Sequence, residues 1–241
     1  MSTSIATNAS GVQVLSGSAR TLEILDARIS ECRACPRLVS WREEVAVNKR
    51  RAYSEEEYWG RPVFGFGPVD ARIVIVGLAP AAYGGNRTGR IFTGDESGNW
   101  LFRSLNRVGL AKSPQSISAR DGQELFNTRL LAAVRCAPPG NAPTTIERDT
   151  CRPWLARELE LLEQAHVYVA LGAFAWESLL ANLDPIPAPK PRFSHGAHVD
   201  LTGGRTLLAS YHPSQQNTYT GRLTEEMLDG VLGAAASLGT R

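Results

Sequence analysis

The sequence lacks the features that would carry it into or across a membrane. No apolar run approaches the roughly 20 residues that a membrane-spanning helix needs, and the N-terminus has no basic segment followed by an apolar one. We therefore expect neither export nor insertion, and a cytoplasmic protein. A strong excess of positive charge is also missing, because 26 basic residues stand against 24 acidic ones. A nucleic-acid partner would have to meet a local basic patch.

Cysteine is scarce, with four residues among 241. In a reducing compartment disulfides do not persist, so these cysteines are not expected to be cross-links. Cys32 and Cys35 form a C-x2-C pair, and Cys136 and Cys151 form a second, wider pair. Four thiolates can hold a structural zinc ion or a [4Fe–4S] cluster, and the spacing alone does not separate the two. Four unrelated cysteines, each buried as a small hydrophobe, are a third alternative.

The first 20 residues are rich in Ser, Thr, Ala, Gly and Asn and carry a single charge at Arg20. Such a polar segment predicts a disordered tail over residues 1–20. The remaining residues 21–241 are long enough for one α/β domain, and a hydrophobic content of 43% supplies its core. We expect a single domain and a monomer.

A Gly-rich loop at residues 77–95 follows an apolar, mostly β-branched run at residues 72–76. The run predicts a strand buried on both faces, as in a parallel sheet between helices. Ligands of such open α/β sheets bind just past the carboxyl ends of the strands. The loop carries residues suited to phosphate contact, stacking and acid–base chemistry, namely Arg87, Arg90, Phe92 and Asp95. It therefore predicts a ligand site, with an ordinary strand-to-helix connection as the alternative.

Alternating strands and helices are predicted along the rest of the chain. Further strands are expected at residues 130–134, 167–171, 198–201 and 206–209, the last two joined by a hairpin turn at Gly203-Gly204. Helices are expected at residues 21–29, 100–108, 146–162, 173–180 and 223–238, with Ser97 or Asp95 as the cap of the second. The loops that carry Asp95, Asn141 and His212 would then follow three of the strands.

Three segments together carry a resemblance to a known family: residues 77–95, residues 132–141 and residues 212–224, which begin His-Pro-Ser. In this order, and with the four cysteines, they resemble the signature segments of family 5 uracil-DNA glycosylases. The likeness extends from about Cys32 to Leu232. It implies a three-layer α/β/α fold around a short central parallel sheet. It also implies a [4Fe–4S] cluster rather than zinc, with Cys32, Cys35, Cys136 and Cys151 as ligands.

The resemblance further implies a DNA-repair enzyme that hydrolyses the N-glycosidic bond of uracil and of other deaminated or damaged bases, hypoxanthine included. Breaking this bond leaves the base as an anion and the sugar as a cation-like species. His212 suits the base side as an N–H donor. Asp95 suits the sugar side as a carboxylate that handles water, with Asn141 as a polar neighbour. Because the motifs contain no lysine for a Schiff base, we expect a monofunctional enzyme that leaves an abasic site.

The target base must leave the duplex and enter a pocket, where Phe92 would stack on it. The run at residues 78–82 has no polar side chain, so Ala81 is assigned to the pocket wall and water handling falls to Asp95. Ala132 stands where uracil-specific relatives have an asparagine, which predicts a broad pocket. Contacts to DNA are assigned to Arg87, Arg90, Ser214, Gln215, Gln216 and Arg222, with the glutamines or Tyr219 filling the gap in the duplex.

Two other hypotheses stay open on the sequence alone. One is a non-catalytic nucleic-acid-binding protein in which an iron–sulfur or zinc site stabilises a basic surface. It predicts that Asp95 and His212 can be replaced without loss of binding. The other is a hydrolase of free nucleotides that uses the Gly-rich loop for phosphate. It predicts that free deoxyuridine nucleotides are cleaved as readily as DNA.

Overall fold

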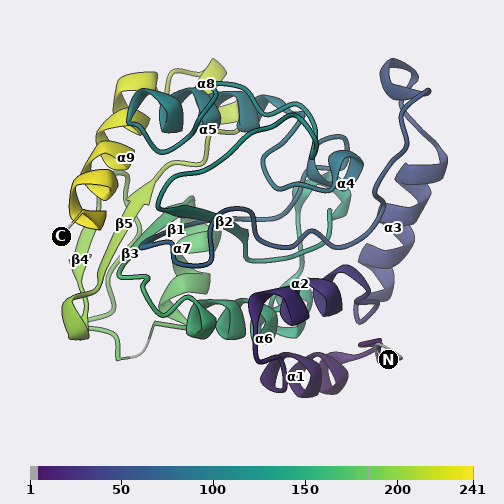
Figure 1. Ribbon diagram of the computed structural model, residues 1–241, viewed down its shortest axis with the longest axis horizontal. Coiled ribbons are helices and arrows are strands. Elements are labelled where there is room, and N and C mark those ends of the chain that lie inside the picture. The colour runs from purple at the N-terminus through teal and green to yellow at the C-terminus, as the bar shows by residue number, and fades with distance from the viewer. Residues whose placement is uncertain (1–4, 184, 241) are drawn as a thin grey trace.

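The computed structural model describes residues 5–183 and 185–240 and folds them around a five-stranded sheet (Figure 1). The strand order is β2-β1-β3-β5-β4, and only β4 runs antiparallel to its neighbour, β5. The strands are β1 (Ile73–Gly77), β2 (Thr128–Ala132), β3 (Val167–Leu171), β4 (His198–Asp200) and β5 (Thr206–Ser210). The predicted hairpin is the β4–β5 pair, and the predicted short, mainly parallel sheet is confirmed.

Helices cover both faces of the sheet, which confirms the predicted α/β/α layers. They are α1 (Ala9–Gly17), α2 (Leu22–Ser30), α3 (Pro36–Val47), α4 (Gly85–Thr88), α5 (Glu96–Arg107), α6 (Thr145–Leu161), α7 (Ala173–Leu180), α8 (Gln215–Tyr219) and α9 (Glu225–Gly239). Short 3-10 turns are η1 (Arg51–Tyr53), η2 (Pro139–Asn141) and η3 (Thr202–Gly204). Helix α6 begins two turns before Pro153, within one residue of its predicted start, and a capping box of Thr144 and Glu147 starts it.

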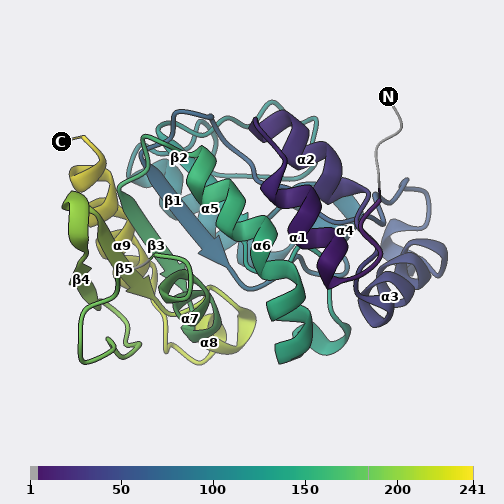
Figure 2. The ribbon, with the colours of Figure 1, turned by 90° about the horizontal axis from the view of Figure 1, so that it is seen from below.

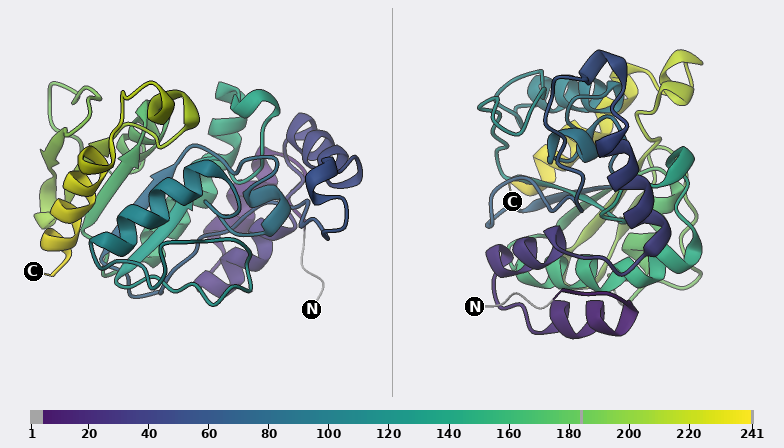
Figure 3. Two further views of the ribbon diagram at one scale, coloured as in Figure 1. Left: turned by 90° about the horizontal axis from the view of Figure 1, so that it is seen from above. Right: turned by 90° about the vertical axis from the view of Figure 1, so that its right-hand side faces the viewer.

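Successive side chains along each strand point to opposite faces of the sheet, so the core is divided into two halves. Val74 and Val76 of β1 pack with α1, α2, α6 and α7, whereas Ile73 and Ile75 pack with α5 and α9. Figure 2, seen from below, shows α1, α2 and α6 over the first face, and the left view of Figure 3 shows α5 and α9 over the second. Both faces of the four parallel strands are therefore buried, as their continuous apolar runs predict.

The N-terminal segment differs from its prediction. Residues 9–17 form helix α1 rather than a disordered tail, and the Asn8 side chain caps it by accepting the Gly11 N–H at 2.8 Å. Val12 is fully buried, and α1 packs along α6. The prediction was wrong for this part of the tail because Val12, with Leu15 packed against the same core, anchors the helix. Residues 1–4 of the predicted tail lie outside the described residues.

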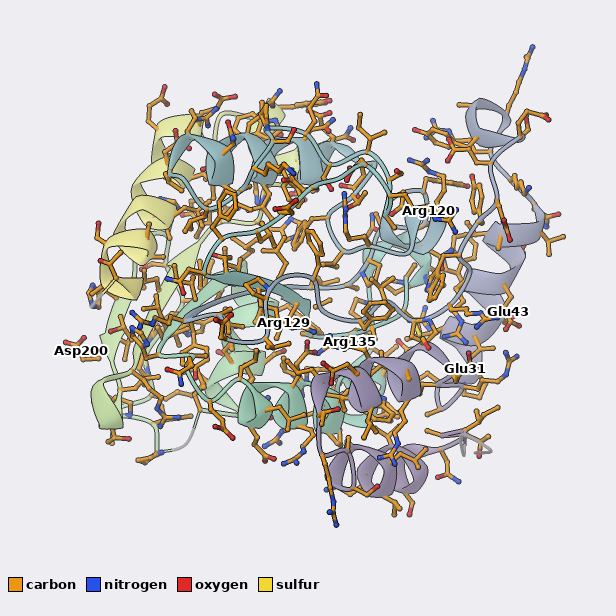
Figure 4. The ribbon with its side chains drawn as sticks, viewed as in Figure 1. Glu31, Glu43, Arg120, Arg129, Arg135 and Asp200 are labelled. Carbon is orange, nitrogen blue, oxygen red and sulfur yellow. The ribbon has the colours of Figure 1, made fainter. Side chains whose placement is uncertain are left out.

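Buried ion pairs join the N-terminal helices to the sheet. Arg129 of β2 pairs with Asp26 of α2 at 3.1 Å and with Glu158 of α6 at 2.8 Å. Glu158 also pairs with Arg135 at 2.7 Å. In Figure 4, Arg129 and Arg135 lie near the middle of the molecule, whereas Glu31, Glu43 and Asp200 lie towards its edges. Removing one partner would leave an uncompensated buried charge, so this group fixes α2 and α6 against β2.

No helix among the described residues is both long and apolar enough to cross a membrane.

Candidate active site

Phe92 lies against the end of β1. A Cβ built on Gly77 would stand 2.4 Å from Phe92 Cζ, so only glycine admits the ring at this position. Phe92 itself has a φ of 51°, in the left-handed region that bulky residues rarely adopt. Backbone strain of this kind persists where the surrounding structure enforces it, and it is concentrated at functional sites. The strain marks the loop after β1 as a candidate site.

His212 follows β5 and meets Phe92. Their ring centroids are 6.0 Å apart with an interplanar angle of 34°. Gly172, which follows β3, packs closely on His212: it has a φ of +91°, and a Cβ there would stand 3.3 Å from His212 Cβ. Burial lowers the pKa of His212 to about 4, so the ring is neutral at neutral pH and carries one N–H donor. The Asn217 side chain fixes the loop by donating to the His212 carbonyl at 2.8 Å.

A cavity of about 270 Å³ opens on the His212 side of this pair, between the ends of β1, β3 and β5; His212 lines it, and Phe92 does not. Its walls include Leu78, Gly172, Tyr211, His212 and Arg222. The guanidinium of Arg222 lies over the Tyr211 ring, 4.5 Å from the centroid. The cavity therefore combines apolar walls, one neutral imidazole and one cation at its edge, which suits a flat polar ring attached to an anionic chain.

Asp95 is the N-cap of α5, one of the two caps predicted. Its Oδ1 accepts the Gly98 N–H at 2.9 Å. A Cβ on Gly84 would stand 1.8 Å from Asp95 Oδ2, so the carboxylate occupies space that a side chain would otherwise fill. Burial raises the pKa of Asp95 above its ordinary value, against the lowering effect of the N–H groups of Gly98 and Ser97. A carboxylate held in this way is suited to accept a proton.

The two alanines assigned to the base pocket lie in different surroundings. Ala132 is paired with Gly77 in the sheet register, is 2% exposed, and belongs to the same half of the core as Phe92. Its methyl group therefore lies on the face of the sheet that Phe92 covers. Ala81 is partly buried, and its carbonyl accepts the N–H groups of Gly84 and Asn86 at 3.2 and 3.1 Å. Ala81 thus shapes the turn that leads to Asp95.

Asn141 is less closely associated with this group than expected. It ends the turn η2 after β2, with a φ of 56° and an exposed side chain. Among the described residues, none of the side-chain hydrogen bonds found joins Asn141 to Asp95 or His212. It occupies the predicted edge of the sheet, because β2 lies beside β1, but its role there stays a prediction.

Arg87 and Arg90 do not fit the phosphate contacts assigned to them. Both side chains are 6% exposed. Arg87 forms an ion pair with Glu56 and donates to two backbone carbonyls. Arg90 pairs with Asp121 at 2.6 Å and donates to Thr93 and Ser116. Because their donors are occupied within the protein, these arginines stabilise the Gly-rich loop rather than present charge at the surface.

The segment after His212 is exposed where contact with a large ligand was expected. Ser214 is the N-cap of α8, Gln215 and Gln216 are exposed, and Tyr219 is 71% exposed. Gln215 Nε2 donates to Tyr219 Oη at 3.4 Å. Arg222 has no ion-pair partner among the described residues. Of the arginines assigned to DNA, it alone is placed at the surface with its charge uncompensated by an acidic side chain.

The four cysteines line one cavity although 119 positions separate the first from the last. Cys32 and Cys35 lie between α2 and α3, Cys136 follows β2, and Cys151 is in α6. Burial raises the pKa of Cys35 to about 12 and that of Cys136 to about 11. Thiolates at such positions need compensating positive charge. Among the described residues, no three or more His, Cys, Asp or Glu side chains are spaced to hold a single metal ion.

Arg42 is a functional candidate that the sequence reasoning missed. It is 2% exposed on α3, and its Nη1 donates to Cys136 Sγ at 2.9 Å while Nη2 donates to the Cys32 carbonyl at 3.0 Å. The Arg135 backbone N–H donates to Cys151 Sγ at 3.3 Å. The signal was present, since Arg42 lies four residues after Leu38 and three before Val45, within the buried stripe of α3.

Comparison with known proteins gives one consistent result. A family model described as the uracil DNA glycosylase superfamily matches residues 64–235. Relatives named type-5 uracil-DNA glycosylase include a Mycobacterium tuberculosis protein, 55% identical over 93% of this chain and 84% of that protein. The Mycobacterium leprae protein of this name is 55% identical over 93% of this chain and 99% of that protein. The Thermus thermophilus protein is 54% identical over 87% of this chain and 94% of that protein.

Proposed function

The chain belongs to the uracil DNA glycosylase superfamily, and we propose that it removes uracil from DNA by hydrolysing the N-glycosidic bond, leaving an abasic site. The observation that carries this proposal is the contact between Phe92 and His212 at the ends of β1 and β5, with His212 lining a cavity of about 270 Å³. An aromatic face and a neutral imidazole are what a flat, carbonyl-bearing base needs. The names of the relatives above support the same conclusion.

In this proposal the target nucleotide rotates out of the duplex and its base stacks on Phe92. The neutral imidazole of His212 then donates a hydrogen bond to the uracil O2, where negative charge develops as the bond breaks. Its low pKa keeps the ring neutral at neutral pH, so the imidazole carries one N–H donor for this role. No covalent bond to the protein is needed, so the enzyme is monofunctional.

Asp95 acts on the sugar side of the same bond. As a carboxylate it orients and deprotonates the attacking water and favours the cation-like sugar electrostatically. Its raised pKa makes it a better proton acceptor than an ordinary aspartate. Asn141 serves as a polar neighbour at the edge of the sheet, and Ala81 as part of the pocket wall.

The direct test uses an end-labelled duplex with one uracil, incubated with the protein and then treated with alkali. Strand cleavage that appears only after alkali is the expected result, since a monofunctional enzyme leaves an intact abasic strand. Cleavage of free deoxyuridine nucleotides at a similar rate would favour a nucleotide hydrolase instead. A protein that binds the duplex but yields no abasic product would be a binding protein, and the proposed activity would be wrong.

For the four cysteines we propose a [4Fe–4S] cluster. The residues fit such a group, because all four thiols line one cavity and two N–H donors point at their sulfurs. Zinc would require four sulfurs about 2.3 Å from one ion, whereas among the described residues no three such side chains are spaced to hold a single metal ion. The cluster would be structural, joining α2, α3, the end of β2 and α6. Arg42 offsets the negative charge of the thiolates.

Cys136→Ser is expected to remove the brown colour of the purified protein together with its iron and acid-labile sulfide, and to lower its Tm. The physical reason is that a hydroxyl is a poor iron ligand, so the cluster would lose one of its four ligands and the other three thiols their common partner. Ala34→Ser is the matched control, since Ala34 lines the same cavity and supplies no thiol. Zinc without iron or sulfide in wild-type protein would contradict the cluster.

The range of bases follows from Ala132. We propose that the pocket accepts hypoxanthine and other deaminated bases besides uracil, because an alanine methyl cannot read a base edge by hydrogen bonds. Ala132→Asn is expected to change the ratio of uracil to hypoxanthine excision by about tenfold or more. Ala132→Val is the control, as it adds similar bulk without a polar group. An unchanged ratio in Ala132→Asn would remove Ala132 from the account of specificity.

Contacts to DNA are proposed for Ser214, Gln215, Gln216 and Arg222. Gln215, Gln216 and Arg222 are exposed, Ser214 is partly buried, and the four surround the His212 loop. Arg222 would meet a phosphate, and Tyr219 or the glutamines would fill the space that the flipped nucleotide leaves. Phosphate contact predicts that binding weakens steeply with salt. We propose that the protein acts as a monomer on DNA that contains uracil or another deaminated base.

A further inference from the structure

Arg87 is a buried arginine whose guanidinium is held on every side. Its Nε donates to the Tyr83 carbonyl at 2.7 Å, and its Nη2 donates to the Gly94 carbonyl at 2.9 Å. Its Nη1 pairs with Glu56. The guanidinium carbon also lies 3.9 Å from the centroid of the Tyr53 ring. Three hydrogen bonds and one aromatic contact therefore fix the guanidinium in one position.

Two of these contacts lie at the walls of the Asp95 site. Gly94 directly precedes Asp95, and Tyr83 directly precedes Gly84, whose missing Cβ leaves the space for Asp95 Oδ2. Gly94 has a φ of +75°, and a Cβ there would stand 2.4 Å from Arg87 Nη2. One guanidinium therefore binds the backbone at two points beside Asp95: next to Gly84, which faces the carboxylate, and at Gly94, which precedes it.

We propose that Arg87 is a positioning residue for Asp95, fixing the carboxylate through the carbonyls of Tyr83 and Gly94. This inference rests on the proposed role of Asp95 in uracil excision. Arg87 does not touch the substrate, and its effect is exerted on where Asp95 lies and on its charge state. An error of about 1 Å in the position of such a group can lower a rate by about 100-fold.

Arg87 also joins Asp95 to a more distant part of the chain. Tyr53 and Glu56 belong to the segment that follows α3 and stands out from the right of the molecule (Figure 1). On the same segment, Arg50 lies over the Tyr83 ring, 5.4 Å from its centroid. The backbone N–H of Trp59 donates to the Arg87 carbonyl at 2.9 Å. The segment that follows α3 thus braces the turn beside Asp95 through Arg87.

Arg87 also affects the pKa of Asp95. The positive charge of Arg87, on α4, lowers the pKa of Asp95, while Glu96, on α5, raises it and burial raises it most. A neutral residue at position 87 removes the lowering effect and moves the pKa of Asp95 further upward. The carboxylate then forms only at higher pH, so the acid side of the pH–rate profile moves to higher pH.

The test is single-turnover excision of uracil from a duplex, with enzyme in excess, for wild type, Arg87→Met and Arg87→Lys. Arg87→Met is expected to lower the saturated rate by about 100-fold and to leave the affinity for uracil-containing duplex little changed. Its acid limb should move to higher pH. Arg87→Lys keeps the charge but cannot span both carbonyls, so its acid limb should stay in place while its rate still falls.

Arg90→Met is the matched control, because Arg90 is equally buried, lies in the same loop and pairs with Asp121 instead of Glu56. A general loosening of the loop would lower both rates alike and overturn the proposal. An unchanged acid limb in Arg87→Met, or a loss confined to affinity, would overturn it as well. If Arg87→Met does not fold, Arg87→Lys decides: a wild-type rate overturns the proposal. Absence of uracil excision by wild type would instead refute the proposed function.

Discussion

Asp95→Asn is expected to lower the rate of uracil excision by about 10²–10⁴-fold, the usual contribution of a positioned acid–base group. The asparagine keeps the shape of the side chain and can still cap α5 by accepting the Gly98 N–H. It loses the negative charge that orients water and favours the cation-like sugar. Single-turnover excision at neutral pH measures this loss, with the four-cysteine site intact as judged by colour.

The same variant should not lose stability. Because the pKa of Asp95 is raised in the folded state, the folded protein binds a proton more tightly than the unfolded chain. Ionised Asp95 therefore disfavours folding, and its unfavourable effect grows as pH rises from 3.8 through the raised pKa. Removing the charge should leave the free energy of unfolding at neutral pH unchanged or higher. The wild-type excision rate should rise with pH through the same raised pKa.

Asp95→Ala separates the cap from the charge. It removes both, and the lost cap should lower the free energy of unfolding by about 1 kcal/mol relative to Asp95→Asn. Both variants should be equally slow in excision if the charge is what matters. Recovery of most of the activity in Asp95→Asn alone would mean that Asp95 acts only as a helix cap, and the proposed water-handling role would be wrong.

His212→Ala is expected to lower the excision rate by about 10²–10³-fold, the usual loss when one preorganised donor to a developing anion is removed. The imidazole lies beside Phe92, His212 packs against Gly172, and Asn217 holds the His212 loop by a hydrogen bond. The donor thus needs no reorganisation when charge develops on the base. His212→Gln retains an N–H group and should recover part of the rate. His198→Ala, on the exposed strand β4, is the control for histidine loss elsewhere.

A pH titration of stability checks the neutral state of this ring. The pKa of His212 is about 4 in the folded protein and about 6.5 ordinarily, so the unfolded chain binds more protons between these values. The free energy of unfolding should therefore fall as pH drops from about 6.5 to about 4. In His212→Gln the fall across this window should be smaller. Equal pH dependence in both proteins would mean that the ring is not held neutral by burial.

Much of the fold could be predicted from the sequence because the local sequence patterns were strong. Continuous apolar runs predict strands buried on both faces, and β3 and α7 begin and end at the predicted residues. β2 begins two residues before its predicted start. Thr128 and Arg129 are polar, so their residue types do not indicate that they belong to a buried strand. Arg129 can be buried there because it pairs with Glu158. Helix α1 was not predicted for a similar reason. Its burial depends on the surface of α6, which lies more than 100 residues away in sequence.

The active site divides in the same way. The sequence by itself was enough to predict which residues carry chemistry, since Phe92, Asp95, His212 and the four cysteines lie in segments that resemble one family's signature. It could not distinguish a surface arginine from a buried one, because a guanidinium suits a phosphate and a carboxylate equally well. Arg87, Arg90 and Arg42 were therefore decided by the tertiary structure. Their partners Glu56, Asp121 and Cys136 lie 31, 31 and 94 positions away, and only folding brings those groups together.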